Sequence, residues 1–521
     1  MIIGIDAGGT NVDAVLLGPD GIVDDVKSAK ADPSTAIDDV LGQLQQEHDL
    51  SGVERVVVAT TLVLNAAVEG RLPDCSNLIV PGPGLSPELA FHGEENRVLE
   101  GCVDHRGRVT EEVEEVPEPD HEVVAITSKF CTRNPDLEQI VFRELDRSED
   151  RVALGHQTSG RLGFPNRAAT TVFNAKGSPV LKEFAGTLNE TIQERGVESP
   201  VYFMKGDAGM LTESIMSQTP SQTVRSGPAA SSLGLLALTE EKQAICVDIG
   251  GTTTDITLIE NGYPALQEGF EAGELYSMYR AVDSIDLPIG GDTRVDQSGI
   301  TGNREGNAAA FGGDHPTPTD ALHVRGDFTT GDVAAAREAL RTIGEPEEVS
   351  EQVIEEMING ICRGVRQLAD RLGHRPDHLI AGGVLAPVLV ASIEERIEWI
   401  QEAKAPSFAH VAGAVGCAAA RVSLRTHVHI DSAQGVMTVN RVGREEKRHV
   451  TKGKTFDADE LREIGCEEAK ASALHAGGSE DQEAEVQTLR SFNVVQQGRK
   501  RGQIANMTSQ VVPGLDRWVQ S

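Results

Sequence analysis

One glycine-rich loop occurs twice in this chain of 521 residues, and this repeat constrains the fold more than any other feature. Asp6–Asp13 reads DAGGTNVD and Asp248–Asp255 reads DIGGTTTD, so both fit D-x-G-G-T-x-x-D at a constant offset of 242 residues. Each copy lies between two short runs rich in β-branched residues, which predicts a β-hairpin with the motif at its turn. An internal repeat of this kind predicts two related lobes, each presenting one hairpin.

The residue types of the repeated loop suit a bound phosphate chain. Paired glycines let main-chain N–H groups approach phosphate oxygens closely, and the threonine hydroxyl adds a donor. A glycine hairpin without a ligand is the alternative, but two matching copies favour a nucleotide clamped between two lobes. The predicted nucleotide-binding residues of the two loops are Gly8, Gly9, Thr10, Asn11, Gly250, Gly251, Thr252 and Thr253.

The aspartate that begins each motif calls for a cation, because a carboxylate repels phosphate. Asp6 and Asp248 can hold a hydrated Mg²⁺, which prefers oxygen ligands and retains waters. Either carboxylate could also orient an attacking water or accept its proton. We therefore predict that Asp6 and Asp248 are both catalytic and metal-binding, and we leave open which of them acts on the water.

Two later glycine turns complete the predicted nucleotide site. Gly290-Gly291-Asp292 is one of them, and Gly382-Gly383 follows the predicted strand His378–Ala381. A glycine pair between a strand and a helix suits the floor under an adenosine, where the backbone must pass close to the ligand. We also predict that Gly299–Gly313 is a mobile, glycine-rich loop.

The remainder of the chain reads as alternating strands and helices, which argues for an α/β fold. Predicted elements include a helix over Ser34–His48, strands over Arg55–Thr60 and Val123–Ser128, and an amphipathic helix over Ile354–Leu372. This alternation of strands and helices stops near residue 420. We predict a first lobe over residues 1–190, a second over 191–420, and a small accessory domain over 421–521.

The acidic balance of the chain limits its partners. Asp and Glu number 81 against 47 Lys and Arg, which gives a net charge of −34. Such a surface disfavours nucleic acid and anionic membranes. It favours adaptation to a salty cytoplasm, where self-repulsion is screened, and an ordinary acidic cytosolic protein is the alternative.

The location expected for the protein is the reducing cytoplasm. The seven cysteines form no C-x-x-C pair, no apolar run is long enough to span a membrane, and the first residues lead directly into the glycine loop without a signal peptide pattern.

These motifs resemble the superfamily of actin, sugar kinases and heat-shock ATPases, whose fold is a pair of duplicated actin-like, ribonuclease H-like α/β lobes. More narrowly, the chain resembles the A-type hydantoinase/oxoprolinase family. The segments that carry this narrower resemblance are Ala59–Ala66, Lys129–Pro135, Ser226–Ala230, Asp248–Asp255 and Pro316–Ala321.

The resemblance implies an ATP- and Mg²⁺-dependent hydrolase, or its ATP-using subunit, that opens a cyclic amide such as a hydantoin or 5-oxoproline by phosphorylating the amide oxygen. It also implies a separate B-type subunit as partner and an oligomeric enzyme. Two alternatives stay open: an ATPase that remodels or reactivates a partner enzyme, and a small-molecule kinase.

Overall fold

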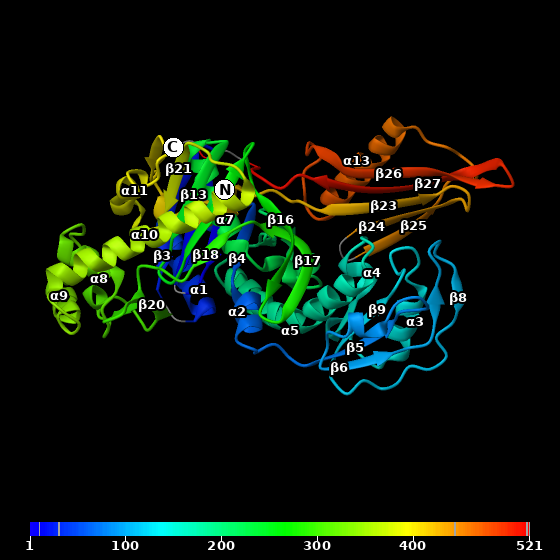
Figure 1. Cartoon of the computed structure of the whole chain (residues 1–521), viewed down its shortest axis with the longest axis horizontal. Helices are drawn as coiled ribbons and strands as arrows, with labels where there is room; N and C mark the ends of the chain where they lie inside the picture. Colours follow the sequence, from blue (N-terminus) through cyan, green and yellow to red (C-terminus); the bar gives the residue numbers. More distant parts are fainter. Residues whose placement is uncertain (10, 30–31, 442–443, 517–518, 520–521) are drawn as a thin grey trace.

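The structure is a computed structural model that describes residues 1–9, 11–29, 32–441, 444–516 and 519. Two separate sheets carry the two copies of the repeated loop (Figure 1). In each sheet the hairpin has a parallel strand beside its first strand: β4 pairs with β1, and β21 pairs with β13. The sheets therefore repeat the same local topology, and the prediction of duplicated actin-like α/β lobes is confirmed.

The first sheet has the strand order β12-β11-β4-β1-β2-β3. β1, β4 and β11 run parallel to one another, whereas β2, β3 and β12 are antiparallel to their neighbours. Its strands are β1 (Ile2–Ala7), β2 (Val12–Gly18), β3 (Gly21–Ser28), β4 (Arg55–Thr60), β11 (Val201–Met204) and β12 (Met210–Thr212).

The second sheet has the order β15-β14-β13-β21-β22, with β18 also pairing with β14. Its strands are β13 (Gln243–Ile249), β14 (Thr254–Glu260), β15 (Tyr263–Pro264), β18 (Ile285–Leu287), β21 (His378–Gly382) and β22 (Glu402–Lys404). Hydrophobic side chains of α10 (Pro346–Leu372) cover one face of this sheet and form a core with it.

Two helices cross between the sheets, α7 (Ser226–Thr239) and α12 (Ala412–Ala419). Their contact has no room for side chains: a Cβ on Gly234 would lie 1.8 Å from the carbonyl oxygen of Ala412, and one on Gly416 would lie 1.9 Å from that of Ala230. α12 also lies on β1, where a Cβ on Gly4 would lie 2.1 Å from a helix carbonyl. Small residues thus let backbone pack directly on backbone at the centre of the molecule.

An insert follows β4 and forms its own four-stranded parallel sheet, in the order β10-β9-β5-β6. Its strands are β5 (Cys75–Val80), β6 (Glu95–Val98), β9 (Val123–Ser128) and β10 (Val152–Leu154). The long helix α5 (Phe164–Glu194) then leads the chain from the insert back to the first sheet.

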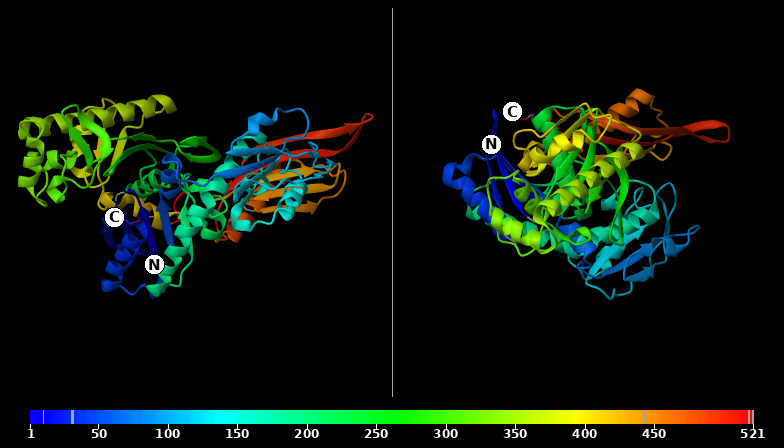
Figure 2. Two further views of the ribbon diagram at one scale, coloured as in Figure 1. Left: turned by 90° about the horizontal axis from the view of Figure 1, so that it is seen from below. Right: turned by 60° about the vertical axis from the view of Figure 1, so that its left-hand side comes forward.

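The C-terminal region is an antiparallel sheet of order β25-β24-β23-β27-β26 covered by one helix, α13 (Ala458–His475). Its strands are β23 (Arg425–Asp431), β24 (Val436–Arg441), β25 (Arg444–His449), β26 (Ala484–Gln496) and β27 (Arg499–Val511). This sheet lies beside the insert (Figure 2), and Arg106 of the insert bonds the carboxylate of Asp431 with both arms of its guanidinium.

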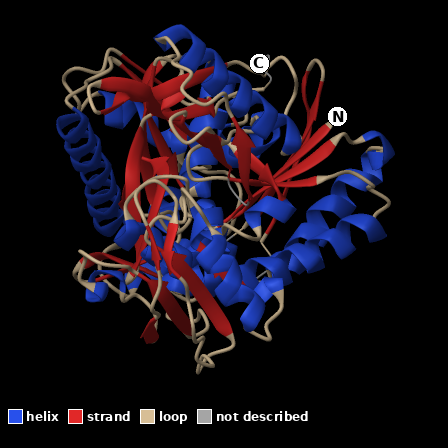
Figure 3. Ribbon diagram, turned by 90° about the vertical axis from the view of Figure 1, so that its right-hand side faces the viewer, coloured by secondary structure: helices blue, strands red, loops and turns tan. Residues whose placement is uncertain are grey.

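The remaining elements surround these sheets (Figure 3). The hairpin β16–β17 lies between α5 and the second sheet, and α8 and α9 pack against α10. These elements are α1 (Pro33–Glu47), α2 (Leu62–Val68), β7 (Cys102–Val103), β8 (Val109–Glu111), α3 (Asp136–Glu144), α4 (Gly155–Thr158), α6 (Glu213–Met216), β16 (Leu266–Ala272), β17 (Leu275–Val282), β19 (Thr293–Asp296), β20 (Gly299–Arg304), α8 (Pro318–Arg325), α9 (Val333–Arg341) and α11 (Ala386–Glu394). No helix among the described residues combines the length and the apolar composition needed to cross a bilayer.

Most predicted elements agree with the structure, and one was wrong. α1, β4 and β9 match their predicted segments closely, whereas α10 begins at Pro346, eight residues before the predicted start at Ile354. The predicted mobile loop over Gly299–Gly313 instead begins as strand β20, which pairs with β19. The carboxylate of Glu356 on α10 accepts the N–H of Ile300 and fixes this strand on the second lobe. The predicted divisions at residues 190 and 420 stay predictions; β11 and β12, which follow residue 190, pair into the first sheet.

Candidate functional site

The two aspartates of each repeated motif are cross-strand neighbours. Asp6 pairs with Asp13 across β1 and β2, and Asp248 pairs with Asp255 across β13 and β14. Each hairpin therefore carries two carboxylates at the base of its glycine turn. Sequence reasoning selected only the first aspartate of each copy, although the eight-residue motif ends in an aspartate both times.

The carboxylates of the two hairpins influence one another across the lobes. Burial, helped by the negative charges of Asp13 and Asp248, raises the pKa of Asp6 to about 8. Burial also raises the pKa of Asp248, and burial together with the charge of Asp286 raises that of Asp255 well above its usual range. Like charges gathered in a place of low polarity disfavour ionisation. The arrangement brings Asp6 and Asp248 together, as the repeat predicts.

Two further side chains, Ser231 and Lys27, contact this carboxylate cluster. The hydroxyl of Ser231 on α7 donates a hydrogen bond to Oδ2 of Asp248. The ammonium group of Lys27 on β3 lies 2.9 Å from Oδ1 of Asp13, and its charge opposes the rise in the pKa of Asp6. The sequence offers no pattern that selects either residue, because each reaches the cluster from an element outside the repeat.

The first loop is open toward the solvent. Gly9 is exposed, Gly8 and Asn11 are partly exposed, and the nearest atom to a Cβ on Gly9 would be Nδ2 of Asn65 at 4.0 Å. Asn65 lies on α2, where its amide donates to the hydroxyl of Thr61. The predicted ligand Thr10 lies outside the described residues. The glycines here leave main-chain groups accessible to a ligand.

The predicted turn Gly290-Gly291-Asp292 lies directly on the second loop. The N–H of Gly291 donates to the carbonyl of Gly250 at 2.9 Å, and that of Asp292 donates to the carbonyl of Gly251 at 2.7 Å. A Cβ on Gly290 would lie 2.4 Å from the carbonyl oxygen of Gly251. Because these two N–H groups bond the loop itself, the turn holds the shape of the second loop, around Thr252 and Thr253.

The glycine pair Gly382-Gly383 lies beside the base of the second hairpin. Gly382 is the register partner of Asp248 in the parallel pairing of β21 with β13. Gly383 has a φ of +89°, its N–H donates to the carbonyl of Ala409, and a Cβ would lie 2.1 Å from the carbonyl oxygen of Ile249. Only glycine fits this conformation and this space.

The start of α7 points into the same region. Ser226 ties it to the end of β4, since its hydroxyl accepts the N–H of Thr60 and donates to the carbonyl of the same residue. Arg225 precedes the helix with a φ of +63°, and its positive charge opposes the rise in the pKa of Asp255. The N-terminus of a helix and a nearby arginine both favour an anion.

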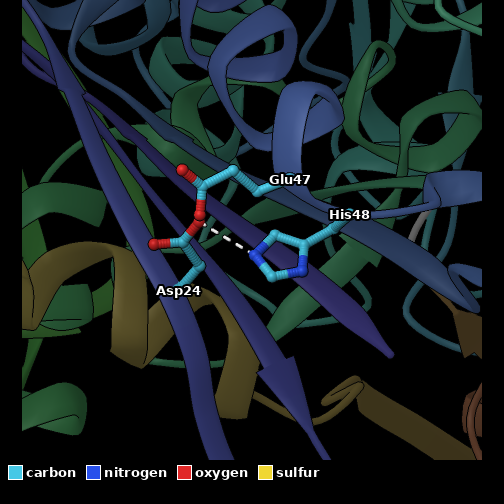
Figure 4. A group of neighbouring side chains, drawn as sticks. All are labelled: Asp24, Glu47 and His48. Atoms are coloured by element: carbon cyan, nitrogen blue, oxygen red, sulfur yellow. Dashed lines mark hydrogen bonds and ion pairs between the residues drawn. The ribbon is translucent and has the colours of Figure 1, made fainter.

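A group of possible metal ligands lies elsewhere, at the end of α1 and on β3 (Figure 4). Ligand atoms of Asp24, Glu47 and His48 all lie within 4.8 Å of one another, and Nε2 of His48 is 2.9 Å from Oδ2 of Asp24. The group is partly exposed, and the ion pair between His48 and Asp24 accounts for its geometry. Asp6 and Asp248 do not belong to it.

Two family models match the chain. The model described as hydantoinase/oxoprolinase matches residues 167–426, and the model of the hydantoinase/oxoprolinase N-terminal region matches residues 2–84. These matched segments include both copies of the repeated loop.

Three similar proteins illustrate this relationship. The caprolactamase subunit alpha of Pseudomonas jessenii is 25% identical over 468 residues, covering 76% of this chain and 67% of its own length. The 5-oxoprolinase 1 of Arabidopsis thaliana is 27% identical over 260 residues, covering 41% of this chain and 20% of its own length. The crystal structure of the ATP-dependent caprolactamase from Pseudomonas jessenii shares the fold with a TM-score of 0.71 at 20% identity, over 99% of this chain and 88% of that one. The chain thus spans about two thirds of one relative and about a fifth of the other.

Proposed function

The chain belongs to the hydantoinase/oxoprolinase family, and we propose that it is the ATP-using component of an enzyme that opens a cyclic amide such as a hydantoin or 5-oxoproline. One observation carries the proposal: two glycine hairpins each carry a pair of carboxylates at their base, and the charge of Asp248 in one hairpin acts on Asp6 in the other. The 25% identity to a caprolactamase subunit and the 27% identity to a 5-oxoprolinase support the substrate class.

The residues at the loops fit ATP and Mg²⁺. Main-chain N–H groups of Gly8, Gly9 and Gly251 would hold the phosphates, whereas the N–H of Gly250 donates to the carbonyl of Thr253 and shapes the second loop. The carboxylates are the hard oxygen ligands that Mg²⁺ prefers, and a divalent cation would relieve the repulsion that raises the pKa values of Asp6 and Asp248. When bound, Mg-ATP supplies the phosphoryl group that makes the amide carbon electrophilic.

The two predicted catalytic aspartates differ in their surroundings, and we assign them different roles. The hydroxyl of Ser231 fixes the carboxylate of Asp248, which suits it to hold a cation in a constant position. Burial and the charges of Asp13 and Asp248 make the carboxylate of Asp6 more basic than usual, so that once ionised it can accept a proton from a water more readily than a surface carboxylate. Asp6 is therefore our candidate for the water-orienting base.

The proposed reaction balances as follows. Transfer of the γ-phosphoryl group to the amide oxygen gives ADP and an imidate phosphate, and the amide proton is released. A water adds to the activated carbon, the C–N bond breaks, and the nitrogen takes a proton. Hydrolysis of the resulting acyl phosphate by a second water releases phosphate and the open-chain carboxylate.

A partner subunit is part of the proposal. The caprolactamase relative is described as a subunit alpha, which supports a multi-subunit enzyme. We infer that this chain activates the amide and that a B-type subunit completes the hydrolysis, within a cytoplasmic oligomer. The charge of −34 supports a chain adapted to a salty cytoplasm.

Substrate-dependent ATP turnover tests the proposal directly. Turnover should be measured with hydantoin, 5-oxoproline, caprolactam and acetone, with and without any co-purified partner subunit. Stimulation by one cyclic amide, with formation of its open-chain product, is expected. Turnover that ignores all four compounds but responds to an unrelated enzyme would instead indicate a remodelling ATPase, and a stable phosphorylated product would indicate a kinase.

Substitution of Asp248 tests the assignment of the site. Asp248→Ala should abolish ATP hydrolysis but leave part of the nucleotide binding. The substitution removes a ligand of the cation, whereas the main-chain groups that bind the phosphates stay in place. Asp24→Ala is the matched control, since Asp24 belongs to the acidic group at the end of α1. Hydrolysis measured alongside binding of a fluorescent ATP analogue separates the two effects, and unchanged hydrolysis in Asp248→Ala would contradict the assignment.

A further inference from the structure

A cavity of about 40 Å³ lies where the first sheet, hairpin β16–β17, helix α4 and the C-terminal sheet meet. By the usual measure this is room for roughly three waters, or for one carboxylate or phosphate group. Five cationic side chains and a single carboxylate line it: Arg161, Lys205, Arg280, Arg425, Arg441 and Asp207. This concentration of positive charge stands out in a chain whose net charge is −34.

The cations around this cavity exceed their carboxylate partners. Lys205 is paired with Asp207 at 3.0 Å. Arg161 and Arg425 share one carboxylate, that of Glu268, which lies partly in solvent. Arg441 is paired with Glu446 and Glu468, two carboxylates that it shares with Arg448. Each of these four cations therefore has a carboxylate within ion-pair distance.

Arg280 is the fifth cation that lines the cavity. Its Nη2 donates to Oε1 of Gln510, a neutral group, and its Nε is buried without a hydrogen-bond acceptor. Among the residues that the structure describes, no carboxylate forms a direct ion pair with this guanidinium, although Asp207, Glu268 and Glu485 lie near enough for their charges to act on it. A partly buried cation without a counter-ion is unfavourable unless an anion joins it.

Titration behaviour agrees with an excess of positive charge. Burial and the charge of Arg425 lower the pKa of Arg280 to about 10, and burial also lowers that of Lys205. Burial, together with Arg425 and Arg161, lowers the pKa of His427 to about 3. Each of these groups therefore resists carrying a positive charge at its position.

The cavity opens at the same edge of the first sheet as the first glycine loop. Ile5, Val58 and Phe203 lie level across the parallel strands β1, β4 and β11, so Lys205 lies level with Ala7, two strands away. Two strand spacings amount to roughly 10 Å. Ligands of parallel sheets bind at this carboxyl edge.

We propose that this cavity is a binding site for a small oxyanion, a carboxylate or phosphate group, held by Arg280 and Lys205. A guanidinium can bind such a group through two parallel N–H donors, and the ammonium adds a third charge-assisted bond. Two sources carry this chemistry: a carboxylate on a cyclic amide substrate, and a free inorganic anion. The first source rests on the proposed function, whereas the second does not.

Equilibrium binding to the full chain tests the site without relying on activity. Isothermal titration calorimetry and thermal unfolding would use sodium 5-oxoproline, sodium phosphate, and 2-pyrrolidone as the neutral lactam that lacks the carboxylate, all at constant ionic strength. At least one of the two anions should bind and raise the unfolding temperature. Arg280→Gln should weaken this binding by about tenfold or more, and Arg280→Lys should restore part of it.

A matched control separates the site from general charge effects. Arg195 is also a partly exposed arginine that lines a surface hollow, but it is bonded to Asp38. Arg195→Gln should leave anion binding unchanged. If Arg280→Gln does not fold, Lys205→Gln serves instead, with thermal unfolding and nucleotide binding as checks of the fold.

The possible outcomes are distinct. Binding of 5-oxoproline but not 2-pyrrolidone, lost in Arg280→Gln, supports the site and identifies the substrate carboxylate as its occupant. Binding of phosphate alone with the same sensitivity supports the site and identifies a free anion. Absence of binding by both anions, or equal effects of Arg280→Gln and Arg195→Gln, would overturn the proposal. Failure of ATP-driven ring opening with anion binding intact would remove the proposed function alone.

Discussion

A single added methyl group at Gly413 should displace the carboxylate of Asp6. Gly413 lies in the first turn of α12, and a Cβ there would be 2.0 Å from Oδ2 of Asp6. Ordinary contact begins at 3.4 Å, so the two groups must separate by about 1.4 Å (3.4 minus 2.0). The effect of Gly413→Ala therefore depends on whether α12 or Asp6 on β1 can move.

The backbones on both sides of this contact are fixed. Asp6 lies on β1, which is hydrogen-bonded to β2 on one side and β4 on the other. α12 cannot retreat because Gly416, one turn later, already touches the backbone of α7 at Ala230. The carboxylate itself must therefore rotate away. Such overpacking costs about 1–3 kcal/mol of stability, and misplacing a reacting group by about 1 Å lowers turnover roughly a hundredfold.

The assay compares ATP turnover and thermal unfolding in two variants of the same helix. Gly416→Ala introduces an overlap of similar size, with a Cβ 1.9 Å from the carbonyl oxygen of Ala230, but away from Asp6. Gly416→Ala should lose at least as much stability as Gly413→Ala, because its Cβ meets main-chain atoms that cannot rotate aside, whereas Gly413→Ala should lose far more turnover. Equal losses of turnover in the two variants, or full turnover in Gly413→Ala, would refute the reasoning.

Three further perturbations test separate features. Ser231→Ala removes the hydroxyl group that donates to the carboxylate of Asp248. The Mg²⁺ concentration needed for half-maximal turnover should rise by about 10–100-fold, and an unchanged Mg²⁺ titration would show that this hydrogen bond does not help to hold the cation. Burial and the charge of Arg133 lower the pKa of His429 to about 4, so the folded state resists protonation and stability falls as pH drops from about 6.5 toward 4. His429→Gln should abolish roughly 2 kcal/mol of that loss at about pH 5 in urea unfolding, and parallel pH profiles would contradict this. Arg106→Ala leaves the carboxylate of Asp431 buried without its bidentate partner and should lower the free energy of unfolding by about 3–5 kcal/mol. Proteolysis between the insert and the C-terminal sheet should become faster. Resistance equal to that of the wild type would show that this contact contributes little.

The local sequence pattern predicted several strands and the two repeated hairpins well. β4 and β9 have the bounds that their β-branched runs predict, and the duplicated hairpins follow from one motif read twice. The strand β20 could not be predicted in this way. Gly299 and Gly302 read as a loop, whereas their positive φ angles of +109° and +79° are accommodated in a bulged pairing with β19 that only the folded lobe provides.

The residues of the candidate site also fall into those that the sequence motif predicted and those that it did not. Asp6, Asp248 and the glycines were predictable because the motif places them at the turn of a hairpin. Ser231 and Lys27 were not, because a serine in a small-residue helix and a lysine on an outer strand carry no distinguishing pattern. The turn at Gly290–Asp292 was predicted as a ligand-binding segment, and its main-chain bonds to the second loop give it a bracing role that no local pattern encodes.

The position of α12 also governs the order in which the molecule can be assembled during synthesis. β1 leaves the ribosome long before α12, yet this helix, residues 412–419, covers Gly4 on the strand and is made only after the whole second sheet. The first sheet, whose last strand β12 ends at Thr212, must therefore keep one face uncovered while about two hundred further residues (412 minus 212) are translated. Contacts of such long sequence separation fold slowly and leave apolar strands exposed in the meantime. The nascent chain is thus most exposed to aggregation, and most in need of a chaperone, until α12 emerges.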